Sequence, residues 1–162
     1  MLHESASGPV ADRPATDGAV GRARPALLHA SCVELSGTGV VLLGPSGCGK
    51  SDLALRLIDR GARLVADDRV TVERHGEDLI ARAPEAIAGL IEVRELGIMR
   101  LDHCPSSTLG LVVALGEIPP LRLPGRATYQ MLGVALPYFQ LDPRAPSACA
   151  KIRLALAAEL VE

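Results

Sequence analysis

Residues 44–51, GPSGCGKS, have the glycine, lysine and hydroxyl spacing of a loop that binds nucleotide phosphates. In such a loop, backbone N–H groups and the N-terminus of the next helix form a concave anion site, and glycine permits the close approach. Lys50 would reach the β- and γ-phosphates, and Ser51 would bind Mg²⁺. The candidate nucleotide-binding residues are Gly44, Pro45, Ser46, Gly47, Cys48, Gly49, Lys50 and Ser51. The alternative is a glycine-rich turn that matches by chance.

Two adjacent carboxylates, Asp67 and Asp68, follow the apolar run LVA. An acid at a strand end beside a phosphate loop is typical of phosphoryl-transfer sites. If extended geometry persists, the two side chains point to opposite faces and have different roles. One would approach the metal or its waters, and the other would take a proton from an attacking hydroxyl. A solvated turn that opens a hairpin is the alternative.

A second charged pair, Glu92 and Arg94, interrupts the apolar stretch GLIEVRELGIM. Residues two apart share a face of an extended segment, so both would point into one site. A surface ion pair explains the pattern equally well. His29 is alone among apolar neighbours, and such a histidine is more often structural than catalytic. The run DHC at 102–104 lacks further ligands at metal-binding spacing, so we expect no metal cluster there.

The elements around the phosphate loop appear in the order that the motif requires. Strand-like runs at 27–36 and 40–44 are joined by turn residues, which predicts a hairpin that leads into the loop. A helix is predicted after Lys50, and Gly61 would end it. Its apolar stripe consists of Leu53, Ala54, Leu57 and Ile58. This context favours a true phosphate loop over a chance match.

The rest of the chain predicts short elements in mixed order. Runs at 63–74 and 78–84 indicate a second hairpin, and Pro84 would open a short helix over PEAIAGLI. Two extended runs follow, TLGLVVALG and GVALPYFQL. A final helix would be capped by Ser147. The predicted fold class is α/β with a mixed sheet rather than a regular βαβ series.

Composition limits the kind of protein. The chain has 162 residues, of which 48% are apolar, enough for one domain with one core. Residues 1–25 have few large apolar side chains, so we expect a disordered tail followed by one domain over 26–162. The net charge of −2 gives no basic footprint for a nucleic acid and no membrane patch. Without a long apolar run or paired cysteines, we expect a cytoplasmic protein.

Taken together, GPSGCGKS, LVADDRV and GLIEVRELGI resemble the catalytic domain of HPr kinase/phosphorylase, the bacterial serine kinase that regulates the phosphotransferase system. The similarity covers Leu27 to about Met99 and depends on the spacing of these motifs. It implies a P-loop kinase domain akin to phosphoenolpyruvate carboxykinase. It also implies ATP and Mg²⁺ as cofactors, an HPr-like phosphocarrier as partner, and a homo-oligomer, since the family tends to form hexamers.

The resemblance also assigns roles. Asp68 would be the general base for the substrate serine and the acid in the reverse dephosphorylation. Lys50 and His29 would act at the phosphates, while Ser51 and Glu92 would hold Mg²⁺. Two further residues, Asp67 and Arg94, would belong to the same site.

The catalytic arginine that the family carries on a mobile loop matches Arg122, with Arg126 as the substitute. The sequence departs from the family elsewhere. The N-terminal domain is replaced by a short tail, Glu95 stands where the signature has glycine, and the late Pro-Gly-Arg segment linked to dephosphorylation is not recognisable in LDPRAPSACAK. We therefore expect kinase activity and leave the reverse reaction open. The alternatives are a nucleotide-sensing module without catalysis and a small-molecule kinase on the same core.

Overall fold

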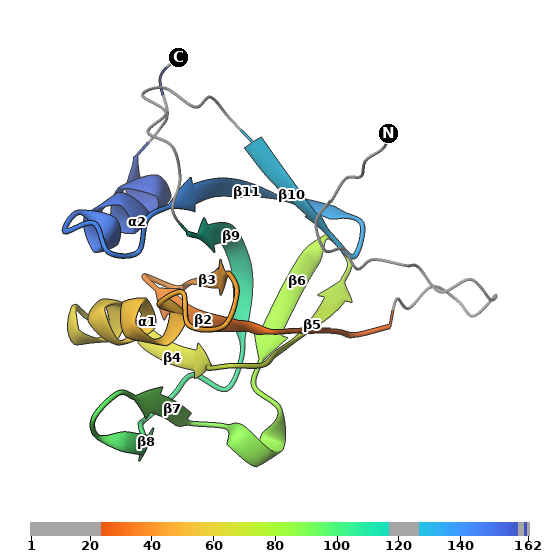
Figure 1. Ribbon diagram of the computed structural model, residues 1–162. Coiled ribbons are helices and arrows are strands. Elements are labelled where there is room, and N and C mark those ends of the chain that lie inside the picture. The colour runs from red at the N-terminus through yellow and green to blue at the C-terminus, as the bar shows by residue number, and fades with distance from the viewer. Residues whose placement is uncertain (1–23, 117–126, 159–160, 162) are drawn as a thin grey trace, which may run out of the picture.

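The computed structural model describes residues 24–116, 127–158 and 161 (Figure 1). The strands are β1 (Ala26–Leu28), β2 (Ala30–Leu35), β3 (Thr38–Leu43), β4 (Arg63–Ala66), β5 (Val70–His75), β6 (Asp78–Arg82), β7 (Leu90–Val93), β8 (Gly97–Arg100), β9 (Ser107–Leu115), β10 (Ala127–Met131) and β11 (Val134–Leu141). The helices are α1 (Lys50–Asp59) and α2 (Ala148–Ala157), with a short 3₁₀ turn η1 (Glu85–Ile87). Within the described ranges no helix is long and apolar enough to cross a membrane.

The main sheet is mixed, as the sequence predicts. Strand β3 runs parallel to β9, which also pairs in parallel with β11, while β2 runs antiparallel to β3 and β4. The strand order is β1-β5-β6-β9-β3-β2-β4, and β11 and β10 branch from β9. Strands β7 and β8 form a separate hairpin, which lies beside β4 in Figure 1. The expected α/β class with a mixed sheet is confirmed.

Two aliphatic clusters cover the two faces of this sheet. Because neighbouring residues of a strand point to opposite faces, Leu42 of β3 packs into one cluster and Val41 into the other. The first cluster receives Leu53 and Leu57 of α1 and Ile152 of α2. Both helices therefore lie on one side of the sheet (Figure 1), and α1 begins next to the end of β3.

The hairpins β2–β3 and β5–β6 and the helix after the glycine-rich loop are present as predicted. The predicted runs at 27–36 and 63–74 are each divided into two strands, β1 with β2 and β4 with β5. The prediction of a short helix over PEAIAGLI is wrong beyond its first turn. Only the 3₁₀ turn η1 forms, which ends at Ile87, and Gly89 adopts φ 79°. The residues that follow join β7 instead, which pairs with β8, and Ile91 packs into the first cluster with 1% of its surface exposed.

At the start of the last helix, Ser147 occupies the predicted N-cap position. Its side chain makes no capping hydrogen bond, and its carbonyl oxygen accepts one from Lys151 N at 2.8 Å. The predicted tail over 1–25 lies almost wholly outside the described residues, and so do Arg122 and Arg126.

Candidate functional site

The phosphate loop connects the buried strand β3 to the N-terminus of α1. Gly47 and Gly49 adopt φ 82° and 109°, a left-handed region that glycine enters without steric cost. A Cβ atom at Gly44 would lie only 2.5 Å from Sγ of Cys48, so the loop closes tightly on itself. The glycines of the motif therefore meet backbone requirements of this loop.

Lys50 places its charge inside the loop. Its side chain is buried, and Nζ donates hydrogen bonds to the carbonyl oxygens of Gly44 at 2.7 Å and Pro45 at 3.1 Å. The ammonium thus lies close to the N-terminus of α1, where the helix dipole also favours an anion. Both features suit the concave side of the loop to a phosphate group.

Asp67 is buried at 6% exposure and joins three elements. Its Oδ1 accepts hydrogen bonds from Ser31 Oγ and Ser51 Oγ, both at 2.7 Å. Its Oδ2 accepts a third bond from the backbone N of Glu92 at 3.2 Å. Asp67 therefore fixes β2, α1 and β7 relative to one another around the phosphate loop.

Asp68 faces the other way and is exposed. Its Oδ1 lies 3.1 Å from Nε2 of His29, and its Oδ2 lies 3.9 Å from Nε of Arg69. The two aspartates do differ in environment, but not through strand alternation, because β4 ends at Ala66 and Asp68 has φ 74°. The expectation of continued extended geometry is wrong, and a reversal of the backbone separates the two carboxylates.

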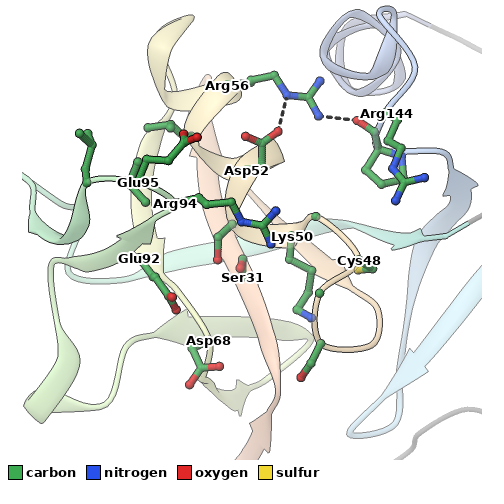
Figure 2. A pocket seen from close by; sticks show the side chains of 18 of the residues that line it. Ser31, Cys48, Lys50, Asp52, Arg56, Asp68, Glu92, Arg94, Glu95 and Arg144 are labelled. Atoms are coloured by element: carbon green, nitrogen blue, oxygen red, sulfur yellow. Dashed lines mark hydrogen bonds and ion pairs between the residues drawn. The ribbon is translucent and has the colours of Figure 1, made fainter.

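Asp68 and residues 46–51 of the phosphate loop line one cavity of about 960 Å³ (Figure 2), whereas the buried Asp67 is not part of its wall. His29 and Asp68 lie at its wall together with the phosphate loop, and Glu92 and Arg94 come from the β7–β8 hairpin. Arg94 lies in the turn after β7 rather than in the strand, so the two do not share a strand face as expected. Both nevertheless line the same cavity.

Glu95 also lines this cavity, in the same turn. Its backbone has φ 75°, a conformation that favours glycine and strains a residue with a Cβ atom. A glycine, which the resemblance implies at this position, would adopt this backbone conformation without strain. In this chain the turn also brings a carboxylate to the rim of the cavity.

Three residues of the cavity wall carry no distinct sequence signal. Ser31 lies on β2 and contacts Asp67, Arg56 lies on α1, and Arg144 follows β11. For Ser31 the sequence gives only a weak indication of a place in the site, namely a hydroxyl two residues after His29. No local pattern indicates Arg144, because its place beside the phosphate loop depends on the parallel pairing of β11 with β9 and of β9 with β3.

The donor set near Ser51 fits Mg²⁺. In phosphoryl-transfer sites this ion takes one or two carboxylates and completes its shell with phosphate oxygens and waters. The Ser51 hydroxyl and the Glu92 carboxylate line the cavity, and both residues are tied to Asp67. Within the described part of the chain no group of three or more histidines, cysteines or acids forms a metal-binding cage.

The chain resembles known proteins over part of its length. The model of the HPr serine kinase C-terminal domain matches residues 22–106, just over half of the chain. A curated HPr kinase/phosphorylase from Caldanaerobacter subterraneus is 52% identical over 73 residues, which cover 44% of this chain and 24% of the relative. One from Malacoplasma penetrans is 34% identical over 125 residues, or 69% of this chain and 42% of the relative. The chain thus spans less than half of the length of these relatives.

A solved structure extends the likeness to most of the chain. The HPr(Ser) kinase/phosphatase from Coxiella burnetii superposes with a TM-score of 0.71 and 25% sequence identity. The match covers 82% of this chain and 99% of that one, so it includes the described strands and helices well beyond residue 106. With the matching domain model and the phosphate loop that leads into α1, these findings show that the chain belongs to the HPr serine kinase C-terminal domain family.

Proposed function

We propose that this chain is an ATP- and Mg²⁺-dependent serine kinase that phosphorylates HPr or a related phosphocarrier. The observation that carries the proposal is that a phosphate loop and an exposed carboxylate, Asp68, line one cavity. Asp68 lies 3.1 Å from His29, which holds the carboxylate in place. A phosphate site beside an accessible base is the arrangement that phosphoryl transfer to a hydroxyl needs.

The residues act mainly by positioning and by balancing charge. The loop N–H groups, the N-terminus of α1 and Lys50 bind the β- and γ-phosphates. Mg²⁺ bound near Ser51 and Glu92 would neutralise charge on the phosphate oxygens. The serine oxygen attacks the γ-phosphorus, its proton passes to Asp68, and the bond from phosphorus to the β-γ bridging oxygen breaks to release ADP.

The same groups can operate in the opposite direction. Inorganic phosphate would attack the phosphorus of phosphoserine, the bond from phosphorus to the serine oxygen would break, pyrophosphate would form, and a protonated Asp68 would return its proton to the serine oxygen. The proposed activity is the kinase reaction alone, and the reverse reaction is left to experiment. A phosphorylated carrier incubated with inorganic phosphate measures it directly.

A nucleotide-sensing module without catalysis is a second candidate, and Glu95 is the observation that favours it. Its carboxylate lies at the cavity, where it would repel phosphate groups or an acidic substrate. This candidate binds ATP through Lys50 without turnover on any carrier. A kinase that acts on a small molecule would instead label a metabolite while the carrier stays unmodified.

The test is transfer of the γ-phosphoryl group from labelled ATP to purified HPr. Wild-type protein should label the carrier, and Asp68→Asn should lower the rate about a hundredfold or more. Asp78→Asn is the matched control, since Asp78 is exposed at the start of β6 and outside the cavity. Absence of transfer by the wild type, or undiminished transfer by Asp68→Asn, contradicts the proposal. The homo-oligomer and the cytoplasmic location stay predictions, and sedimentation of the full chain tests the former.

A further inference from the structure

The segment between β11 and α2 forms a wall of the cavity next to the phosphate loop. A Cβ atom at Gly49 would lie 3.5 Å from the Pro143 ring, so the two loops are in close contact. The segment is also held within itself, because Asp142 Oδ1 accepts a hydrogen bond from Arg144 N at 2.9 Å and Asp142 O accepts one from Ala145 N at 3.1 Å. Its backbone is therefore well defined beside the loop.

Arg56 fastens this segment to the helix that begins at the phosphate loop. Its Nε lies 3.1 Å from Oδ2 of Asp52, one turn earlier on α1. Its Nη2 donates a hydrogen bond to the carbonyl oxygen of Pro143 (Figure 2). The planar guanidinium thus uses two sides of its donor fork at once, which an ammonium group cannot do with the same geometry.

The segment between β11 and α2, which Arg56 holds through Pro143, places Arg144 in the wall of the cavity. Within the described residues, no carboxylate lies within ion-pair distance of its guanidinium. Arg144 and Arg94 approach the phosphate loop from opposite sides in Figure 2, with Lys50 between them. A guanidinium in this position matches the geometry of phosphate oxygens, which it can bind in bidentate fashion.

We propose that Arg144 binds the phosphate chain of the bound nucleotide and that Arg56 is the positioning residue that keeps Arg144 in place by holding Pro143. The proposal deepens the nucleotide site of the proposed function and rests on it. Arg144 supplies a positive charge from a part of the chain about ninety residues beyond the motif. Arg56 in addition offsets the charge of Asp52 at the start of α1.

Calorimetric binding of ATP and of inorganic tripolyphosphate to the full chain tests this proposal. Arg144→Gln should weaken both probes to a similar extent, by about tenfold or more, because a charged hydrogen bond is lost. The control is Arg82→Gln, since Arg82 is an exposed arginine of β6 that pairs with Glu73 away from the cavity. A loss confined to ATP would place Arg144 at the nucleoside and overturn the proposal, as would unchanged binding of both probes.

A double-variant experiment separates the positioning role of Arg56 from a general effect on stability. Arg56→Gln should weaken tripolyphosphate binding in the same direction, and the double variant with Arg144→Gln should bind no more weakly than Arg144→Gln alone. Arg56→Lys keeps the charge but not the fork, so it should also weaken binding while thermal unfolding stays near that of the wild type. Fully additive losses, or wild-type binding by Arg56→Lys and Arg56→Gln, would contradict the positioning role.

These outcomes are distinguishable from failure of the proposed kinase function. Binding needs no carrier protein, so wild-type binding with a loss in Arg144→Gln supports the inference even where no carrier is labelled. Conversely, a chain that phosphorylates HPr but binds tripolyphosphate equally well with Arg144→Gln overturns only the inference. A wild-type chain that binds neither probe overturns both.

Discussion

The Ser51 hydroxyl donates its hydrogen to Oδ1 of Asp67 at 2.7 Å, and the same oxygen accepts a second hydroxyl hydrogen from Ser31. With Glu92 N bound to Oδ2, both oxygens of the buried carboxylate accept hydrogen bonds from the protein. A proton acceptor for a substrate must be reachable, so of the two aspartates only Asp68 suits the proposed role of base. The pair of adjacent aspartates therefore divides into one carboxylate that organises the site and one that faces the cavity.

Matched amide substitutions at the two aspartates should separate these roles. Asp67→Asn replaces Oδ2 by an amide donor that faces the N–H of Glu92, so we expect a loss of about 1–3 kcal/mol in the free energy of unfolding. Asp68→Asn should change stability by no more than about 0.5 kcal/mol, because the side chain is exposed and Asn tolerates a positive φ. Urea denaturation measures both values, and equal losses would contradict the division of roles.

A substitution at Glu95 should stabilise the protein. Glycine relieves the strain of φ 75°, which outweighs the extra freedom that glycine adds to the unfolded chain. We expect Glu95→Gly to raise the free energy of unfolding by about 0.5–1 kcal/mol, a rise of a few degrees in Tm for a chain of this size.

Glu95→Ala is the matched control for charge. It removes the carboxylate but keeps a Cβ atom at a left-handed position, so thermal unfolding should change little. If alanine and glycine raise Tm equally, the carboxylate rather than the backbone is responsible. Titration with tripolyphosphate of the same two variants then reports whether the carboxylate repels phosphate.

The sequence predicts the part of the site that local patterns encode. The hairpin β2–β3, the glycine-rich loop and α1 lie within about thirty residues, and each has its own periodicity or turn signal. The two carboxylates after β4 are likewise adjacent in sequence. Local patterns therefore suffice to identify the phosphate loop and a candidate base in the sequence, while the pairing of β4 with β2 brings them together.

Long-range pairing determines the rest, and no local pattern encodes it. Arg144 reaches the phosphate loop because β9 lies between β3 and β11, two strands about ninety residues apart in the chain. The different environments of Asp67 and Asp68 depend on a φ value that a non-glycine residue rarely adopts. The wrong helix after Pro84 has a similar origin, since pairing of β7 with β8 outweighs the local helical preference.

The four cysteines should differ in reactivity toward iodoacetamide. Cys48 is partly exposed in the phosphate loop, whereas Cys32, Cys104 and Cys149 are buried. Burial raises the pKa of the Cys32 thiol, and Cys104 beside it adds to this effect. Burial also raises the pKa of Cys104. Since the thiolate is the nucleophile, these two should react slowly at mildly alkaline pH.

Mass spectrometry of the alkylated protein should therefore find a single fast site, lost in Cys48→Ala. Tripolyphosphate should slow the reaction at Cys48, because the anion occupies the loop that carries this thiol. Protein unfolded in denaturant, in which all four thiols react, serves as the control. Rapid labelling of Cys32 in the folded protein would contradict the burial of β2.

The ionisation of Tyr129 should make stability depend on alkaline pH. Burial raises the pKa of Tyr129 to about 12, and Tyr138, whose ring centroid is 5.8 Å away, contributes to the rise. The neutral phenol is thus favoured in the folded state, so its contribution to stability is present below pH of about 10 and is lost as pH rises toward about 12. The chain has two tyrosines and no tryptophan, so Tyr138→Phe leaves Tyr129 as the only phenol in the absorbance titration. The midpoint of this titration should stay above the ordinary value in the folded variant and return to it in denaturant. A folded midpoint at the ordinary value would show that packing against the second cluster does not shield the Tyr129 phenol.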